Sequence, residues 1–595
     1  MPLATEPANG KTPIARIGLI VTFAIMIHAA LLWLLADGLG LRASYATLIA
    51  FLTAVVVGYR VYDHFDVRSE HLLEGARPGL IMTACTGACI NALVFTMMTD
   101  VFSAGHWRAF VVATLALPPA LFVVANSLAR DQAMNDQTPV GIRLLAWPAI
   151  IFAAAAAYTL FFHYQAPYVD DWELVPVWSA AQTGSLEPAR LFVQHGGHWV
   201  ASGYVVMLAT AELTDMAHWP VVTISLLISG IGFIGLFDIL RRTLFELDEV
   251  RSLPLVATFS AFIYFSLDQS ENWLWTWQVS LFASIAGVIW CIALLMRPSL
   301  NGARLALACA CAAIAVYGFA TAWCLLPVGF FLIAIVPETS RRRRALAALA
   351  WAVLFGLLLW HFTSVRTDYT AAMLPDRSAL ETLMGISQYV ANYFTSPVFR
   401  GYKPAAALVA PAAIIAVLVI LWLTWQHFRT RLIAYRGIVA LMAFSMGAGL
   451  LTGLGRWGTF GAEQAFSNRY ITISNFAWLG GVVAALILLP KLSRNMRALF
   501  LLGLIGFTTA KLVNNVSAYN NARLALRVNA AACELALHSS DTPEESMLIL
   551  SAPQQAIAPR LRLLEAGKVS LFRPAAVKRC QARGDRPGDT PDVNQ

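Results

Sequence analysis

Long apolar runs recur along the chain from about residue 14 to about residue 513, and short polar segments separate them. About fifteen of these runs hold roughly 16 to 24 apolar residues, the length with which an α-helix crosses about 30 Å of hydrocarbon. The pattern predicts an all-α polytopic membrane protein with about fifteen transmembrane helices. The apolar stretch 200–212 is shorter, and we expect a helix that lies at the membrane interface there.

Composition points to the same surroundings. Of the 595 residues, 58% are hydrophobic and 13% are charged, whereas a soluble domain carries about 25% charged residues. The formal net charge is +8, but the arginines stand in short loops, where membrane topology requires them. We therefore expect a lipid bilayer and no nucleic acid as a partner. The first apolar run is too long for the core of a cleaved signal peptide.

Every second loop between the apolar runs is basic. The basic residues of these loops are Arg60, Arg68, Arg77, Arg130, Arg143, Arg241, Arg242, Arg251, Arg341, Arg342, Arg343, Arg344, Arg429, Arg431, Arg436, Lys491, Arg494 and Arg497. Loops rich in Lys and Arg stay in the cytoplasm, so these loops and the N-terminal residues 1–12 are expected there. The intervening loops and the tail 516–595 are then outside the cytoplasm.

The eight cysteines show no metal-binding spacing. Six of them lie inside apolar runs, where a thiol behaves as a small hydrophobic group. Cys533 and Cys580 lie in the polar tail, and they could form a disulfide if the tail is outside the cytoplasm.

Residues 13–133 form two similar halves, each with two apolar runs, which end in VVVGYRVYDHF and FVVANSLARDQ. This module resembles the GtrA-like family, small membrane proteins implicated in moving polyprenyl-phosphate sugars across the bilayer. Arg60, Phe65 and Asn126 match residues of that family, whereas Asp63 and His64 stand near the place of its aromatic partner. Alternatively, these are ordinary helix ends whose arginines set the topology.

The first long outer loop carries two candidate groups. Asp170 and Asp171 follow an almost purely apolar run, and a carboxylate pair at a membrane surface costs desolvation energy without a packing benefit. One of them could simply cap the segment 172–181. His195 and His198 follow in the sequence HGGHW. They could also be half of a metal site that the aspartates complete.

Two further outer loops carry polar groups beside apolar runs. The turn SLDQSENWLWTWQ places Glu271, Asn272 and Gln278 at the mouth of a predicted helix, although some of its tryptophans could be interfacial anchors. The loop GLGRWGTFGAEQAFSNRYITIS contains Arg456 and Arg469. Arginines in an outer loop run against the usual charge distribution, and a guanidinium suits a phosphate group.

These four motifs, in this order, resemble a bacterial branch of the GT-C membrane glycosyltransferases. That branch has a DDW motif, a His-rich motif that commonly reads HNEHR, a Q-x-E-N-x-x-W-x-x-Q pattern, and an Arg followed by Ser-x-Arg-Tyr. Here two glycines and Trp199 replace the Asn, Glu and Arg of the second motif. The resemblance implies an inner-membrane enzyme whose domain 140–515 transfers a sugar, with inversion, from a polyprenyl-phosphate donor to an envelope polysaccharide, lipid or protein on the periplasmic face.

The resemblance also assigns roles. Asp170 or Asp171 would be the general base. The residues expected at the donor phosphate are Arg456, Arg469, Tyr470 and Lys403, and those expected to contact substrate are His195, His198, Trp172, Glu271, Asn272 and Gln278. No cofactor is certain, although a divalent cation could assist.

The tail 516–595 shows no catalytic signature. We expect helices at 521–537 and 559–566, a strand-like run at 547–550, and a disordered end rich in Pro, Gly, Asp and Arg. Two other functions fit the same sequence: a transporter of lipid-linked sugars whose outer loops only bind, and an envelope assembly protein without activity.

Overall fold

The computed structural model describes residues 146–365, 378–399, 403–488, 514–538 and 554–584, with short stretches or scattered residues at 26–35, 50–57, 500–512 and 549–550. Of residues 403–431 it gives the helix but not the side chains. Arg60, Asp63, His64, Phe65 and Asn126, which relate the N-terminal module to the GtrA-like family, lie outside the described residues. The chain divides into two compact units, Met1–Arg143 and Leu144–Gln595, and the second contains all the candidate site residues.

Six helical segments of the described residues are long and apolar enough to cross a membrane. They are His218–Glu246, Val250–Leu274, Thr276–Leu295, Arg341–Ser364, Leu432–Phe460 and Asn468–Leu488. Three shorter apolar helices cover Trp147–Phe162, Gly302–Val316 and Ala320–Ile335. The described part of the chain has no strand, and one isolated bridge joins His195 to His198. The protein is therefore an all-α membrane protein, as the apolar runs predict.

The number of spans differs from the expected fifteen or so. Much of the N-terminal unit is outside the described residues, and several predicted spans form helices shorter than a bilayer requires. In addition, the two runs predicted on either side of a basic loop at about 429–436 form one continuous helix, α16 (Lys403–Phe460). Arg436 in this segment is buried, and its guanidinium bonds both carboxylate oxygens of Glu246 at 2.7 and 2.8 Å. Where the sequence indicates a loop, the structure therefore has a helical segment with a buried arginine paired to a distant residue.

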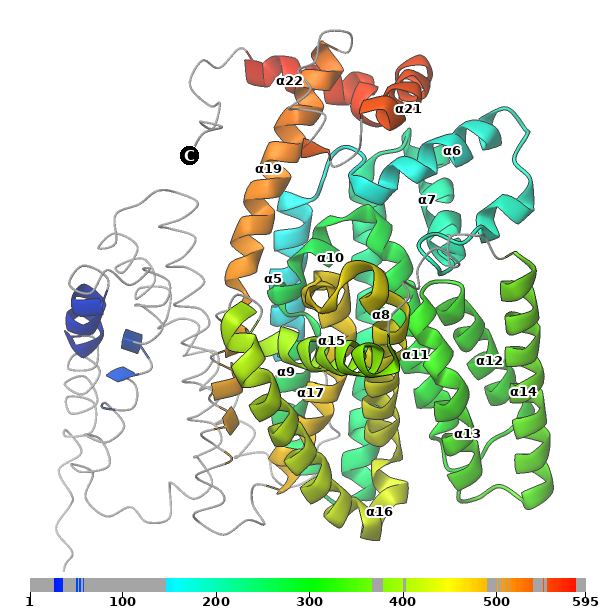
Figure 1. The fold of residues 1–595 in the computed structure, drawn as a ribbon, viewed down its shortest axis with the longest axis vertical. Coiled ribbons are helices and arrows are strands. Elements are labelled where there is room, and N and C mark those ends of the chain that lie inside the picture. Colours follow the sequence, from blue (N-terminus) through cyan, green and yellow to red (C-terminus); the bar gives the residue numbers. More distant parts are fainter. Residues whose placement is uncertain are drawn as a thin grey trace, which may run out of the picture. The chain divides into compact units, whose positions relative to one another are not determined.

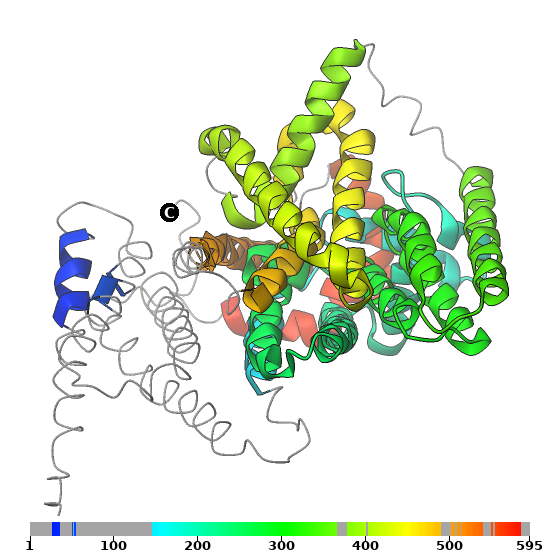
Figure 2. The ribbon, with the colours of Figure 1, turned by 90° about the horizontal axis from the view of Figure 1, so that it is seen from below.

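The spans pack as a bundle around a large apolar core. The helices that pack most extensively against other helices are α8 (His218–Glu246), α11 (Val279–Leu295), α15 (Ala379–Phe399), α16 and α17 (Asn468–Leu488). Helices α12 (Gly302–Val316), α13 (Leu325–Ile335) and α14 (Arg341–Ser364) form one side of this bundle (Figures 1 and 2). Asn301 caps α12 by accepting a hydrogen bond from the backbone N–H of Arg304 at 2.9 Å. Helix α15 occupies most of residues 366–403, which the alternation of basic loops places among the outer loops.

The tail is part of the folded second unit. It contains α19 (Val516–Leu537), α21 (Gln554–Gly567), the short helix η13 (Ser570–Phe572) and α22 (Pro574–Gly584). Figure 1 shows α19, α21 and α22, in orange to red, at the same end of this unit as α6 (Leu174–Gln182) and α7 (Ala201–Thr214). The predicted strand-like run 547–550 is wrong where it is described, because Ile549 is helical and Leu550 is in a turn.

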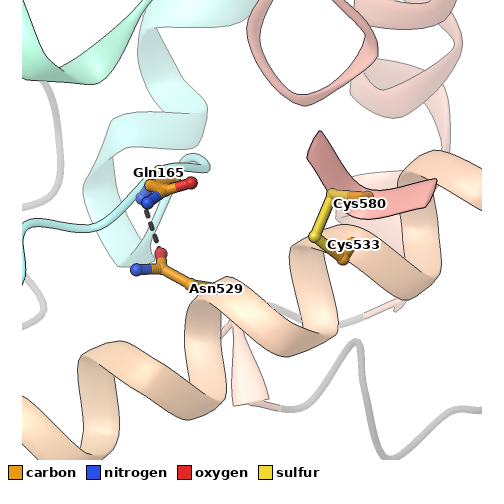
Figure 3. The surroundings of a disulfide bond; sticks show 4 residues. All are labelled: Gln165, Asn529, Cys533 and Cys580. Carbon is orange, nitrogen blue, oxygen red and sulfur yellow. Dashed lines mark hydrogen bonds between the residues drawn. A yellow bond between two sulfur atoms is a disulfide. The ribbon is translucent and has the colours of Figure 1, made fainter. Parts of the chain in front are cut away.

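A second apolar core joins this tail to the first outer loop. Trp172, Trp178 and Tyr204 from the loop and α7 pack in it with Leu564 and Phe572 from the tail. Cys533 and Cys580 form a disulfide with a Cα–Cα distance of 5.3 Å, which confirms that the two tail cysteines can pair. One turn before Cys533 on α19, Asn529 accepts a hydrogen bond from the backbone N–H of Gln165 at 2.8 Å (Figure 3). The tail therefore supports the loop that carries the aspartates.

Candidate functional site

One cavity of about 540 Å³ collects residues from all four outer motifs. Its polar wall includes Asp170, Glu173, His195, His198, Gln278, Arg456 and Arg469. Trp277, Phe319 and Phe460 supply aromatic surface to the same cavity. A concave site with aromatic walls and a few convergent charged groups is the usual form of a ligand-binding pocket.

Asp170 faces the cavity from the short helix η4 (Val169–Glu173). Its Oδ1 lies 3.2 Å from Nε2 of His195. Burial by itself would raise the pKa of Asp170, but the hydrogen bond with His195 and the positive charge of Arg469 lower it overall. Asp170 is therefore an ionised carboxylate that holds an imidazole at the cavity wall.

Asp171 points away from the cavity, although it is the next residue. Its side chain is 3% exposed, and Oδ2 accepts a hydrogen bond from the backbone N–H of Tyr168 at 3.2 Å. Burial raises the pKa of Asp171 from its ordinary 3.8 to about 7, against the opposing effect of a hydrogen bond with Thr276. This carboxyl group therefore holds the start of the turn at Tyr168, whereas α6 (Leu174–Gln182) begins without the side-chain cap that the sequence left open.

The raised pKa of Asp171 predicts a pH-dependent stability. Between about pH 4 and pH 7 the folded carboxyl group keeps a proton that the unfolded chain has lost, so its contribution to stability falls as the pH rises and levels off above pH 7. Asp171→Asn should therefore raise the Tm, relative to wild type, more at pH 8 than at pH 5. The matched control is Asp170→Asn, whose lowered pKa predicts no such difference over this range. Equal Tm differences at both pH values for Asp171→Asn would contradict the assignment.

His195 and His198 close a tight two-residue turn. The backbone N–H of His195 donates to O of His198 at 2.9 Å, and the reverse bond measures 3.2 Å. Gly196 and Gly197 between them have φ angles of 57° and 83°, in the left-handed region where side chains are strained. The two glycines that distinguish this motif from HNEHR are therefore what this turn requires.

His198 is held between an aromatic ring and an arginine. Its ring centroid lies 4.8 Å from that of Phe319. Burial lowers the pKa of His198 to about 3, and the charge of Arg456 adds to the effect. His198 is consequently neutral at physiological pH. Arg456 donates through Nη2 to the carbonyl oxygen of Gly196 at 2.6 Å, which fixes its guanidinium beside the turn.

Arg469 enters the cavity from the first turn of α17. Its guanidinium lies 5.7 Å from the ring centroid of Trp275, and its Nε donates to Oγ of Ser467 at 3.2 Å. Arg456 has a similar aromatic neighbour, because its guanidinium lies 5.4 Å from the ring centroid of Phe460. Each arginine is thus held in place by an aromatic ring and by hydrogen bonding, which for Arg456 includes a contact of 3.5 Å between Nη2 and Nδ1 of His198. The remaining N–H groups of each guanidinium can bind an anion.

Besides Asp171, four expected site residues lie off the cavity wall. Trp172 and Tyr470 are buried, at 1% and 2% exposure, and Tyr470 packs near Tyr389 with a ring-centroid distance of 6.3 Å. Glu271 and Asn272 face α17 instead of the cavity. Lys403 begins α16, and its side chain is outside the described residues.

Glu271 and Asn272 connect their turn to the start of α17. Asn468 donates through Nδ2 to Oε2 of Glu271 at 2.8 Å. Asn272 donates to the carbonyl oxygen of Asn468 at 2.9 Å and to Oγ1 of Thr472 at 2.7 Å. Because Asn468 precedes Arg469, these bonds fix the backbone from which the cavity arginine extends. The geometry gives the two residues a positioning role.

Some residues that line the cavity were not predicted from the sequence. Glu173 lines the cavity and forms an ion pair of 2.9 Å with Arg560 of α21. Gln194, Phe319 and Gln464 also line it. Glu173 directly follows the DDW motif, and this position in the sequence could have identified it as a cavity residue. Arg560 lies in a tail without any motif, and nothing in its local sequence indicates this contact.

No protein-family model, no curated protein and no solved structure matches the chain. In the described residues, no three His, Cys, Asp or Glu side chains gather as a metal ion would require, and no structural observation supports the metal-site alternative for HGGH. The cavity instead combines a carboxylate–imidazole pair with two guanidinium groups. Such a set can take a proton from a hydroxyl group and stabilise a phosphate anion.

Proposed function

We propose that this chain is a GT-C-type membrane glycosyltransferase that moves a sugar from a polyprenyl-phosphate donor to an envelope acceptor. The observation that carries the proposal is the convergence of Asp170, His195, Arg456 and Arg469 on one cavity. These residues come from three separate motifs of the sequence, and together they supply the two functions that such a transfer needs. The acceptor is a polysaccharide, lipid or protein of the cell envelope.

The leaving group determines the role of the arginines. A lipid phosphate leaves as a stable anion and needs no proton from a general acid, but its developing negative charge must be stabilised. Arg456 and Arg469 carry positive charge at the cavity, and their aromatic neighbours hold them in place. A planar guanidinium can bind two phosphate oxygens at once. The arginines are therefore assigned to the donor phosphate.

The acceptor hydroxyl group is a poor nucleophile and needs a base. The pair of Asp170 and His195 is the candidate, because both residues line the cavity and Asp171 is buried behind it. A single displacement by the acceptor would invert the anomeric centre of the sugar. His198 and Gln278 line the same cavity and are assigned to substrate binding.

The glycine turn yields a prediction about Arg456. A Cβ atom on Gly196 would lie 3.1 Å from Nη2 of Arg456, whereas one on Gly184 would meet nothing within 4 Å. Both glycines have positive φ angles, of 57° and 67°, so alanine strains both backbones alike. Gly196→Ala should lower kcat/KM about 10- to 100-fold more than Gly184→Ala, because a guanidinium displaced by even a fraction of an ångström stabilises the phosphate less. Equal losses in the two variants would contradict this role of the turn.

We further propose that the active site faces the periplasm of a bacterial inner membrane, with the N-terminus in the cytoplasm. The alternating basic loops support this orientation, and so does the Cys533–Cys580 disulfide, because disulfides persist outside the cytoplasm. In this arrangement residues 13–133 would bring the donor across the membrane. Tethering that module to the transferase raises the local donor concentration.

The orientation predicts the state of the two tail cysteines in cells. When intact cells are lysed in denaturant with an alkylating reagent, Cys533 and Cys580 should stay unlabelled and become labelled only after reduction. A matched control is Cys291, which is buried in α11 and free, and which should be labelled without reduction once the protein is denatured. Labelling of Cys533 and Cys580 without reduction would indicate a cytoplasmic tail and contradict the orientation.

A strain that lacks the chain tests the function in cells. Mass spectrometry of its envelope glycans should show the loss of one sugar, which wild-type protein restores and Asp170→Asn protein at equal abundance does not. Full restoration by Asp170→Asn would contradict the transferase proposal. It would favour the alternative, a lipid-linked sugar transporter in which the cavity only binds.

A further inference from the structure

Five titratable side chains lie at or behind one wall of the cavity: Asp170, Asp171, Glu173, His195 and His198. Glu173 forms an ion pair of 2.9 Å with Arg560 of α21. Asp171 is 3% exposed, lies behind the wall and holds the backbone N–H of Tyr168. His198 is 8% exposed and packs against Phe319. The low pKa of His198, about 3, shows that its imidazole cannot hold a proton near neutral pH. Asp171 and His198 are therefore not placed to take a proton from a substrate in the cavity, and Glu173 is paired with Arg560, which leaves Asp170 and His195.

The contact between Asp170 and His195 indicates which of these two residues accepts the proton. Oδ1 of Asp170 lies 3.2 Å from Nε2 of His195, so this nitrogen donates its proton to the carboxylate. The His195 ring also packs edge-on against Trp277, with 5.2 Å between ring centroids, and its side chain is 32% exposed. The other ring nitrogen, Nδ1, is then the acceptor of the neutral imidazole. The pKa of Asp170 is lowered, so this carboxylate is the weaker base.

We infer that His195, oriented by Asp170, is the group that removes the proton from the acceptor hydroxyl. This inference rests on the proposed transferase function. As the acceptor oxygen bonds to the anomeric carbon, its proton passes to Nδ1 of His195. The bond between the anomeric carbon and the phosphate oxygen breaks, and the phosphate leaves with the electron pair. Asp170 stabilises the imidazolium that forms, and after product release the proton passes to water.

The surroundings of His195 contain charges of both signs. Asp170 and Glu173 line the same cavity from η4, His198 from the same turn, Arg456 from α16 and Arg469 from α17. Imidazole is the side chain whose charge normally changes between pH 5 and 8. Because a protonated imidazole cannot accept a proton, the transfer rate should rise with pH in this range. A carboxylate base with a lowered pKa would be ionised throughout it and give no such rise.

The test compares pH profiles of the full-length protein in detergent. The donors are radiolabelled farnesyl-phosphate esters of glucose, galactose, mannose and arabinose, the acceptor is delipidated envelope polysaccharide, and released farnesyl phosphate is measured. Wild-type kcat should rise between pH 5 and 8. His195→Gln should lower kcat about 10²- to 10⁴-fold and leave a residual rate that does not rise with pH. Asp170→Asn should be slow but should keep the rise, because it retains the imidazole of His195.

His195→Ala adds a measurement that a misfolded variant cannot mimic. Added imidazole should raise its rate about tenfold or more, with the rise between pH 5 and 8 restored. The inference is overturned if His195→Gln keeps wild-type kcat, if its residual rate keeps the pH-dependent rise, or if imidazole leaves the rate of His195→Ala unchanged. Failure of the proposed function gives a different result, because wild-type protein would then release farnesyl phosphate from none of the donors.

Discussion

Replacing Asp170 with Asn should lower kcat about 10²- to 10⁴-fold while KM for the donor stays near the wild-type value. Asn keeps the shape of the side chain, but it removes the negative charge that orients His195 and stabilises its protonated form. In our proposal the donor phosphate is bound by other residues, so ground-state binding should change little. The measurement is steady-state transfer from the farnesyl-phosphate donors by purified protein.

Asp171→Asn is the matched control for this prediction. It makes the same chemical change at the adjacent position, but Asp171 is buried and does not line the cavity. We expect its kcat to stay within about threefold of wild type near pH 7, where the raised pKa already leaves much of the carboxyl group neutral. A larger loss in Asp171→Asn than in Asp170→Asn would show that the buried carboxylate performs the chemistry.

Replacing Arg469 with Ala should affect both binding and rate. The change removes a positive charge from the phosphate in the ground state and in the transition state, so KM for the donor should rise and kcat should fall, with kcat/KM lowered about 10²- to 10³-fold. Arg469→Lys should recover only part of this loss, because an ammonium group lacks the two-pronged geometry of a guanidinium.

Arg523 provides a matched control on α19. Its guanidinium lies 5.8 Å from the ring centroid of Tyr519, so Arg523→Ala also removes an arginine packed on an aromatic ring, but away from the cavity wall. Its kcat/KM should stay close to wild type. Full transfer activity in Arg469→Ala, or equal losses in both variants, would contradict the assignment of Arg469 to the donor phosphate.

The sequence could predict which segments meet but not which side chains face the cavity. The DDW, HGGH and Arg-containing motifs all reach one cavity. Asp170 and Asp171 are adjacent and chemically identical, and their directions depend on the turn that begins at Val169, with a φ angle of 50°. The N–H of Val169 donates to the carbonyl oxygen of Leu550 in the tail at 3.3 Å. No local pattern could reveal a contact between segments so far apart in the chain.

Buried charges explain other differences from the sequence predictions. Arg436 looks like a residue of a cytoplasmic loop, but its ion pair with Glu246 lets it lie buried in the long helix α16. Lys511 lies in the last predicted span, where it forms a fully buried ion pair with Asp268 and donates to Oδ1 of Asn475 at 2.8 Å. Hydropathy treats each charge as isolated, whereas the fold neutralises it with a partner from another helix.

The anomeric configuration of the product tests the central claim most directly. Purified wild-type protein in detergent, where transport across a membrane is impossible, is given a farnesyl-phosphate sugar and envelope polysaccharide, and the product is analysed by NMR and mass spectrometry. Our account predicts a new glycosidic bond with the anomeric configuration opposite to that of the donor, and one farnesyl phosphate released for each sugar transferred. Recovery of all four donors unchanged, or a product with retained configuration, would contradict it.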